Sequence, residues 1–331
     1  MSTTTRMPLA LRDCHPQREP LVADLLRGLR GTPKHVSPSY FYDARGSQLF
    51  DAICELPEYY VTRTERCILE THAVDIARCI GAQALLVEYG SGASIKTRIL
   101  LDQLPHLSAY VPVEISRAHL LDAAHRLSET YPRLEVLPVC ADFTLPFDLP
   151  KPHRPAARTV VFFPGSTLGN FDPPAAIDLM RLMRNLTGPN GGLVIGTDLV
   201  KNVGILLRAY NDAAGVTAEF NLNLLRRLNR EFGADFDLAA FSHEAIWNAA
   251  ESRIEMHLIS ARQQVVRLAG ERIQFAPGER LVTEHSHKYT LDSFQSQAAE
   301  AGWDLKGTWL DDRRFFGVHY LDACFRRHDH A

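Results

Sequence analysis

The sequence lacks the features that mark disulfide-bonded, membrane-spanning or secreted proteins. Its 331 residues include six cysteines, but no two of them form a C-x-x-C pair, so neither a zinc knuckle nor a disulfide framework is indicated. No stretch approaches the about 18 consecutive apolar residues that span a bilayer, and the first twenty residues lack the apolar core of a secretion signal. We therefore expect a cytoplasmic protein with reduced thiols and no membrane partner.

The chain also lacks an excess of positive charge. Lys and Arg number 36 against 39 Asp and Glu, which gives a formal net charge of −3, and the basic residues are scattered. Because binding to a phosphate backbone requires concentrated positive charge, nucleic acid is not expected as a partner. With 46% hydrophobic and 23% charged residues, the chain can bury a core, and its length suits two domains or one elaborated domain.

Short apolar runs alternate with amphipathic segments between about residues 84 and 200. The runs ALLVEYG, SAYVPVEI, LEVLPVC, RTVVFFPG and GGLVIGTDLV are expected strands, and IKTRILLDQL, SRAHLLDAAHRLSETY and PPAAIDLMRLMRNLTG have helical spacing. Repeated strand–helix units with apolar strands predict an α/β fold with a parallel, doubly wound sheet. In such a sheet, ligands bind at the carboxyl ends of the strands.

After residue 200 the pattern changes. One helical stretch is expected at about 203–230, followed by alternating runs typical of antiparallel strands. The final segments, TLDSFQSQAAEAGW, LKGTWLD and FFGVHYLDA, predict a helix and an antiparallel hairpin that completes the first sheet. The aromatic-rich N-terminal 60 residues have no place in that sheet. We therefore expect a first domain of residues 61–200 plus 288–331, and a discontinuous second α+β domain of residues 8–60 plus 201–287.

A glycine-rich turn follows the first expected strand. The segment VEYGSG places Glu88, Gly90 and Gly92 at the strand end, where glycine lets a ligand approach the backbone. A dinucleotide site would require G-x-G-x-x-G, but the sixth position counted from Gly90 is Ile95, which argues against NAD and FAD. An acidic residue two positions before G-x-G resembles the first motif of S-adenosylmethionine-dependent methyltransferases, whose sheet is Rossmann-like.

Two further strand ends agree with that resemblance. It predicts an acidic residue after the second strand for the ribose hydroxyls, where Glu114 stands, and a polar–aromatic pair for the adenine, which Asp142 and Phe143 supply. Lys96, in the first turn of the helix after the glycines, could pair with a methionyl carboxylate or be an ordinary solvated lysine. Each feature occurs by chance in many α/β proteins, and only their joint occurrence favours a cofactor site.

Longer stretches carry a more specific resemblance. These are YFYDARGSQLFDAICELPEYYVTRTE, VEYGSGASIKTRILLD, FFPGSTLGNF, IGTDLVK, RAYNDAAGVTAEFNLNLLRRLN and RIEM. Together they resemble the histidine-specific N-alpha-methyltransferases of ergothioneine biosynthesis, from about residue 20 to 322. The resemblance implies transfer of three methyl groups from S-adenosylmethionine to the α-amino group of L-histidine, which gives hercynine. It also implies a second domain that closes over the amino acid, and a reaction that needs no metal.

The resemblance also implies roles for individual residues. Those expected to bind the methyl donor are Gly90, Lys96, Glu114, Asp142 and Phe143. Glu114 departs from the aspartate expected there, but either carboxylate can bridge a ribose diol. Those expected around the amino acid are Tyr59 and Tyr210 on its carboxylate, Asn170, the Gly165 backbone and Tyr42 near its amine, Glu284 and Ser286 on its imidazole, and Met256 as pocket wall or core. Tyr42 is expected to orient the amine rather than act as a base, because its ordinary pKa lies near 10.

The stretch TEHSHKYT leaves other readings open. Strand alternation puts Glu284 and Ser286 on one face and His285 and His287 on the other, and the resemblance selects the first face for the substrate. We expect the two histidines to face packing or solvent, although a metalloenzyme would rest on them. Other rivals are an N-methyltransferase of another aromatic amino acid or of a histidine derivative, and a non-catalytic binding protein. We expect a monomer, with FRRHDHA as a solvated tail.

Overall fold

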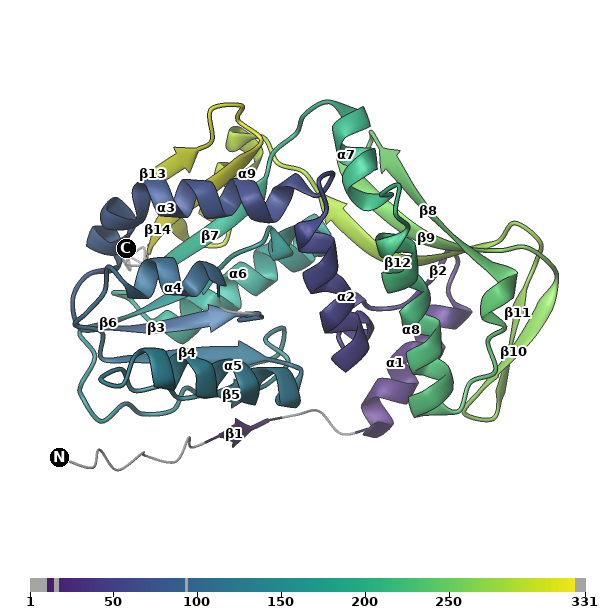
Figure 1. Ribbon diagram of the computed structural model, residues 1–331, viewed down its shortest axis with the longest axis horizontal. Coiled ribbons are helices and arrows are strands. Elements are labelled where there is room, and N and C mark those ends of the chain that lie inside the picture. The colour runs from purple at the N-terminus through teal and green to yellow at the C-terminus, as the bar shows by residue number, and fades with distance from the viewer. Residues whose placement is uncertain (1–10, 15–17, 93–94, 325–331) are drawn as a thin grey trace, which may run out of the picture.

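The chain folds around two main β-sheets that lie next to each other (Figure 1). The computed structural model describes residues 11–14, 18–92 and 95–324. The expected tail FRRHDHA lies outside these residues. Within the described ranges, no helix has the length and apolar character needed to cross a membrane.

The larger sheet has the predicted Rossmann-like organisation. From edge to edge its strands are β1 (Arg12–Asp13), β5 (Val139–Cys140), β4 (Ala109–Glu114), β3 (Ala84–Tyr89), β6 (Arg158–Phe163), β7 (Gly192–Asp198), β14 (Phe316–Ala323) and β13 (Trp303–Leu310). Neighbouring strands are parallel from β1 to β7, and β14 and β13 form the expected antiparallel hairpin. The strand order reverses between β3 and β6, where doubly wound sheets bind ligands.

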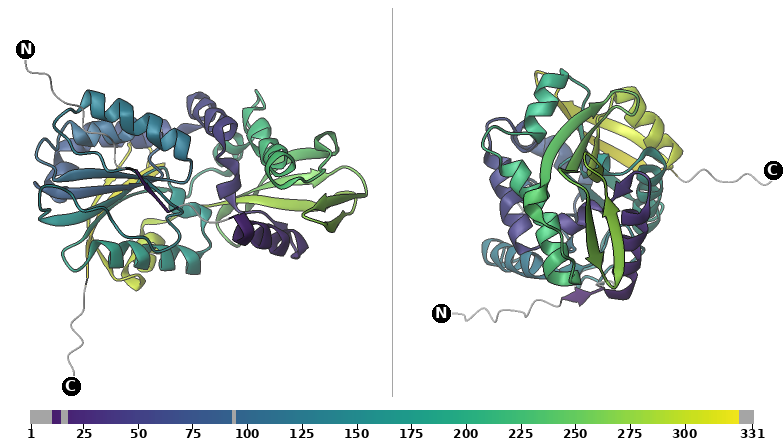
Figure 2. Two further views of the ribbon diagram at one scale, coloured as in Figure 1. Left: turned by 90° about the horizontal axis from the view of Figure 1, so that it is seen from below. Right: turned by 90° about the vertical axis from the view of Figure 1, so that its right-hand side faces the viewer.

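Helices cover both faces of this sheet (Figure 2). One face carries α3 (Tyr60–Ile80), α4 (Ile95–Leu101) and α5 (Arg117–Thr130), and the other carries α6 (Pro173–Thr187) and α9 (Leu291–Glu300). Because both faces are covered, every residue of β3 is buried. The apolar runs that predicted these strands therefore supply the core that holds the strand ends in place.

The second sheet lies beside the N-terminal helices. Its strands, in order, are β2 (Lys34–His35), β12 (Arg280–His287), β9 (Arg253–Ser260) and β8 (Phe241–Asn248), and a separate hairpin joins β10 (Gln264–Leu268) to β11 (Glu271–Phe275). The helices around it are α1 (Arg18–Arg30), α2 (Ala44–Glu55), α7 (Val203–Tyr210) and α8 (Val216–Phe232), with short 3-10 turns η1 (Pro38–Phe41) and η3 (Leu238–Ala240). Helix α1 contacts β2, and α2 contacts α8. The domain boundaries at residues 60, 200 and 287 stay a prediction.

Three local expectations differ from the structure. Arg12–Asp13 pair with β5, so the N-terminal segment does contribute to the large sheet. The single helix expected at 203–230 is two helices, because Asp212 accepts the N–H groups of Val216 and Thr217 and so begins α8 anew. The strand expected over LEVLPVC is short: only its last two residues form β5.

The two sheets meet where the chain passes between them. Tyr289, just after β12, donates its N–H to the carbonyl of Asp198 at the end of β7, and Val200 donates back to Tyr289. The 3-10 turn η2 (Thr167–Asn170) packs against β12 so closely that a Cβ added at Gly169 would lie 2.8 Å from the His287 carbonyl oxygen. The carboxyl ends of the large sheet therefore face strand β12.

Candidate active site

The turn after β3 leaves room for a ligand at the backbone. Gly90 and Gly92 have φ angles of +70° and +45°, a region that glycine adopts without strain. A Cβ added at Gly90 would meet no atom within 4 Å, and the Gly90 N–H donates to the Val113 carbonyl at 2.9 Å. The turn is thus joined to the end of β4 while its other side stays open.

The other predicted donor-binding residues lie at neighbouring strand ends. Glu114 ends β4 and accepts the N–H groups of the next two residues at 2.8 and 3.2 Å, and burial raises the pKa of its carboxyl group. Asp142 follows β5 and accepts from the backbone and hydroxyl of Thr144. The Phe143 ring stacks on Tyr89, with centroids 5.2 Å apart. Three strand ends thus bring two carboxylates and an aromatic ring to the edge where Gly90 lies.

Glu65 connects the two predicted groups of site residues, although the sequence did not single it out. Its fully buried carboxylate accepts from Lys96 Nζ at 2.5 Å and from the Gly165 N–H at 2.9 and 3.0 Å. Gly165 has a φ of +84°, which favours glycine. The Gly165 N–H is therefore already engaged, and its carbonyl is the backbone group that can face an amine. The pairing of Lys96 with a methionyl carboxylate stays a prediction.

Glu284 is a buried carboxylate that receives no hydrogen bond from the residues that the structure describes. Its exposed fraction is 9%, and no hydrogen bond to it is formed by any residue in the described part of the chain. Burial raises its pKa to about 7, although the nearby Lys288 ammonium opposes this shift. Met256 stands directly opposite on β9 and is 2% exposed. A buried carboxylate of this kind favours a ligand that brings its own N–H or O–H donor.

Ser286 and Tyr210 share a buried ammonium group. The Ser286 and Tyr210 hydroxyl oxygens are 2.7 Å apart, and Lys288 Nζ lies 2.7 Å from the first and 2.9 Å from the second. An ammonium group donates only, so it occupies a lone pair on each hydroxyl oxygen. Both hydroxyl hydrogens are thereby directed away from Lys288. One of the two hydroxyls donates to the other, and the second hydrogen is available to a ligand.

Asp198, the carboxylate that pairs with Lys288, also pairs with a second buried lysine. Asp198 lies 2.8 Å from Lys288 Nζ and 2.5 Å from Lys201 Nζ, and the Tyr60 hydroxyl also donates to it. Burial tends to raise the pKa of Asp198, but the two ammonium groups outweigh this and lower it. Burial alone would lower the pKa of Lys288, but the Asp198 carboxylate raises it above its usual range. Burial lowers the pKa of Lys201 to about 8, although the Asp198 carboxylate opposes this shift.

Aromatic side chains form one wall beside Glu284. The Tyr59 ring contacts the Tyr210 ring with centroids 6.3 Å apart, and Tyr42 packs edge-on against Phe50 and Phe220. Burial, followed by the nearby Glu284 charge, raises the pKa of Tyr42 well above its ordinary value. Tyr42 is therefore a neutral phenol at neutral pH, in keeping with an orienting role and against a role as general base.

A cavity of about 580 Å3 connects two of the predicted amino-acid ligands. Its lining includes Asn170 at the end of η2, Glu284 on β12 and most of the segment 31–38. It also includes Asp172, Arg253, Glu255 and His285. No hydrogen bond within residues 11–14, 18–92 and 95–324 engages the Asn170 side chain. Asn170 and Glu284 thus both line one cavity, and no hydrogen bond from the described residues engages either side chain.

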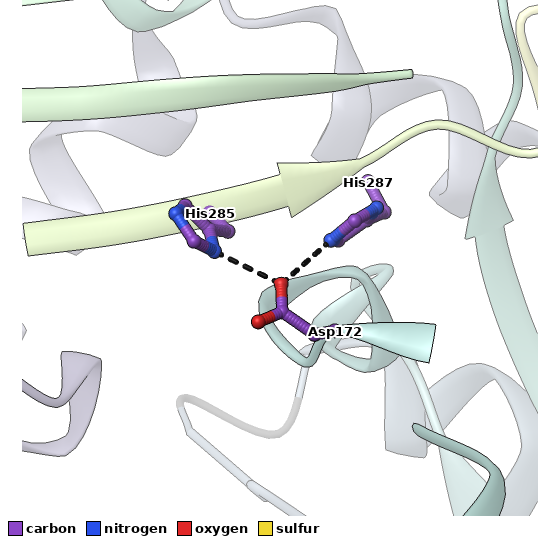
Figure 3. A group of neighbouring side chains, drawn as sticks. All are labelled: Asp172, His285 and His287. Atoms are coloured by element: carbon purple, nitrogen blue, oxygen red, sulfur yellow. Dashed lines mark hydrogen bonds and ion pairs between the residues drawn. The ribbon is translucent and has the colours of Figure 1, made fainter. Parts of the chain in front are cut away.

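His285 and His287 project from the other face of β12, as strand alternation predicts (Figure 3). Their ring nitrogens lie 3.1 and 3.2 Å from one oxygen of Asp172, which precedes α6. Ser286 instead contacts Tyr210 and Lys288. The predicted division of TEHSHKYT into two faces agrees with these contacts, and the two histidines pack against a carboxylate rather than solvent alone.

The sequence is similar to known proteins over almost its whole length. A family profile described as "Histidine-specific methyltransferase, SAM-dependent" matches residues 21–323. The Histidine N-alpha-methyltransferase of Mycolicibacterium smegmatis is 44% identical over 91% of this chain and 94% of that protein. The enzyme of the same name from Mycobacterium tuberculosis is 40% identical over 89% and 92%. Ergothioneine biosynthesis protein 1 of Neurospora crassa is 27% identical over 87% of this chain and 33% of that protein.

Proposed function

The chain belongs to the histidine-specific, S-adenosylmethionine-dependent methyltransferases, and we propose that it transfers three methyl groups to the α-amino group of L-histidine. The product would be hercynine, an intermediate of ergothioneine biosynthesis. Glu284 is the observation that carries the choice of substrate: a buried carboxylate on a cavity wall, without a hydrogen bond from the described residues. An imidazole N–H is a donor that would satisfy it.

Ser286 would read the second imidazole nitrogen. A neutral imidazole has one N–H donor and one acceptor nitrogen, and the Ser286 hydroxyl is held as a donor by Lys288. With Glu284 as acceptor and Ser286 as donor, both ring nitrogens are engaged. Tryptophan has a single N–H and no acceptor nitrogen, so it would leave the Ser286 hydroxyl unsatisfied, which is costly in a buried site.

The Tyr210 hydroxyl, which accepts from the Lys288 ammonium group, would donate to the substrate carboxylate. Lys288 occupies a lone pair of the Tyr210 oxygen, and burial raises the pKa of this phenol, although Lys288 opposes the shift. The protonated hydroxyl can therefore donate to a carboxylate, next to Tyr59. Lys288 is then a positioning residue for both ends of the amino acid. The Tyr210–Ser286 hydrogen bond would open when each hydroxyl turns to its own acceptor.

Hydrogen-bond acceptors would orient the amine. They would not anchor its methylated forms, which have fewer N–H groups. The Asn170 amide oxygen and the Gly165 carbonyl can accept from the N–H groups of a primary amine, with Tyr42 as an orienting phenol. Each transfer replaces an N–H by a methyl group, so the anchors that persist through three transfers are those on the imidazole and the carboxylate. Catalysis then rests on holding the amine lone pair in line with the transferred methyl.

The methyl donor would occupy the carboxyl ends of β3, β4 and β5. The open backbone at Gly90, the Glu114 carboxylate and the Phe143 ring fit a nucleoside of this kind, with Asp142 at the adenine. S-adenosylmethionine would supply an activated methyl group at that edge. The residues of this chain would bind it and exclude water. A monomeric state, a location in the cytoplasm and a reaction without metal stay predictions.

A panel of amino acids tests this function. Purified protein is incubated with S-adenosylmethionine and one amino acid at a time, and S-adenosylhomocysteine release is followed. We expect turnover with L-histidine, and at least about 100-fold slower turnover with L-tryptophan, because one hydrogen bond of the site stays unmade. Faster turnover with tryptophan would overturn the substrate assignment. Histidine binding without any turnover would indicate a binding protein instead.

A further inference from the structure

Three potential metal ligands meet where strand β12 faces the residue that precedes α6 (Figure 3). They are Asp172, His285 and His287, and their ligand atoms all lie within 4.8 Å of one another. His287 and His285 have side-chain exposures of 7% and 21%, whereas Asp172 is 56% exposed. The cluster is therefore formed by two largely buried imidazoles and a carboxylate that solvent can reach.

Both ring nitrogens of His287 face oxygen atoms that can only accept hydrogen bonds. Its Nδ1 lies 3.2 Å from the Glu251 carbonyl oxygen, and its Nε2 lies 3.2 Å from Asp172 Oδ1. Both neighbours are acceptors only, while a neutral imidazole has one N–H. If Nδ1 donates to the carbonyl, the Nε2 lone pair faces a carboxylate oxygen, and two electron pairs oppose each other. A cation between them would remove that conflict.

This arrangement matches the second shell of many histidine metal ligands. Such histidines donate the N–H of one ring nitrogen to a carbonyl or carboxylate, which orients the other nitrogen toward the metal. The Glu251 carbonyl serves that role for His287. Asp172 is also unusual for its position: it is the N-cap residue of α6 but makes no side-chain capping hydrogen bond. Prolines follow it at the next two positions, so the second helical residue, one of the two usual capping donors, has no N–H.

Two of the three separations between the ligand atoms suit a small transition-metal ion. His285 Nδ1 and His287 Nε2 lie 3.1 and 3.2 Å from the same Asp172 oxygen. Ligands bound to zinc at about 2.0–2.2 Å in tetrahedral or octahedral geometry are roughly 3.0–3.5 Å apart. We propose that Asp172, His285 and His287 form a binding site for one divalent cation of the zinc class, with water in the remaining coordination positions.

Arg253 already binds the Asp172 oxygen that a cation would need. Its Nη1 lies 2.8 Å from Asp172 Oδ1, and its Nε and Nη2 are each 2.8 Å from the Glu255 carboxylate. With a cation on Oδ1, Arg253 keeps both bonds to Glu255 and can turn to the second oxygen of Asp172. Its charge weakens cation binding, so removing it by Arg253→Met should tighten the site.

The site would join two elements that carry predicted substrate ligands. Asp172 follows η2, which ends at Asn170, and Ser286 lies between the two histidines on β12. A bound cation would link the residue after η2 to β12. It would thereby restrict the distance between Asn170 and Ser286. Its role would be structural, because none of its three ligands is among the residues expected to contact the amine.

Zinc binding by the full chain tests the proposal. All variants carry His328→Ala and His330→Ala, so that the histidines of the C-terminal segment do not compete. Zn2+ is titrated by calorimetry, and the unfolding temperature is followed in parallel. We expect one ion per chain, a rise in unfolding temperature with Zn2+, and at least about tenfold weaker binding in His287→Ala and His285→Ala, since even second-shell losses cost that much.

The matched control is His153→Ala, which removes an exposed histidine that also pairs with a carboxylate, Glu135. It should bind zinc as the parent does. Equal zinc affinity in His287→Ala and the parent would overturn the proposal, because any ion would then be bound elsewhere, such as at exposed thiols. No zinc binding in the parent would also overturn it and would leave a doubly protonated His287 to satisfy the two acceptors. If His287→Ala fails to fold, the His285→Ala result decides.

Discussion

Replacing Glu284 with glutamine lowers kcat/KM for L-histidine by about 10- to 100-fold, while the affinity for S-adenosylmethionine is unchanged. The side chain keeps its shape, but the charged acceptor of an imidazole N–H is lost, and a hydrogen bond to a charged group contributes roughly 1.5–3 kcal/mol. Steady-state kinetics with histidine, and calorimetry with the methyl donor, measure the two effects separately. Unchanged histidine kinetics would show that Glu284 does not contact the substrate.

The same substitution is expected to stabilise the protein at pH 8. Burial raises the Glu284 pKa to about 7 in the folded chain, from an ordinary value of 4.5. Between these values the folded state binds more protons than the unfolded state, so stability falls as pH rises through this window. Above pH 7 the charged carboxylate costs on the order of 1–3 kcal/mol, which glutamine does not. At pH 4.5 the two proteins should be equally stable in urea denaturation.

This opposition of activity and stability identifies a binding group. If a glutamate had only a structural role, its replacement would lower the stability of the protein, because its hydrogen-bond donors would be left unsatisfied. Glu284 has no such donor among the residues that the structure describes, and its substitution should gain stability while losing activity. Lower stability of Glu284→Gln at pH 8 would argue that the carboxylate has a structural role.

Replacing Lys288 with methionine raises KM for L-histidine about tenfold or more and lowers the free energy of unfolding by about 3–5 kcal/mol. The ammonium group is fully buried, holds the Ser286 and Tyr210 hydroxyls, and pairs with Asp198. Its loss removes the group that makes both hydroxyls donors, and it leaves Asp198 with one ammonium partner. Chemical denaturation and initial-rate kinetics measure these two losses.

Lys201→Met is the matched control for this substitution. Lys201 is also buried and pairs with the same Asp198, but its other side-chain partner is Tyr60 rather than the Ser286–Tyr210 pair. It should therefore destabilise the fold in the same direction and leave KM for histidine within about twofold, since its ammonium touches neither hydroxyl. An equal rise of KM in both variants would mean that the effect of Lys288 is a general loss of stability.

The sequence could predict residues whose neighbours are set by strand geometry. Alternation along TEHSHKYT separated Glu284 and Ser286 from His285 and His287, and the contacts with Tyr210 and Asp172 agree with that division. Strand ends placed Gly90 and Glu114 on one edge because parallel strands end together. In both cases a local period, buried by an apolar core, determines where the side chain lies.

The residues that hold the site together could not be predicted in this way. Lys288 contacts Asp198 and Tyr210, and Glu65 contacts Gly165, across separations of about 80 to 100 residues. These partners come into contact only when both sheets have formed, and no local sequence spacing predicts the contact. The two-residue strand Arg12–Asp13 was missed for a related reason: it is too short to have a period.

The mass of the product tests the central claim most directly. L-histidine is incubated with the purified protein and an excess of S-adenosylmethionine until the reaction stops, and the product is examined by mass spectrometry with fragmentation. The account predicts a histidine that has gained three methyl groups, all on the α-amino nitrogen. Histidine recovered unchanged, or methylated on its imidazole ring, would contradict it.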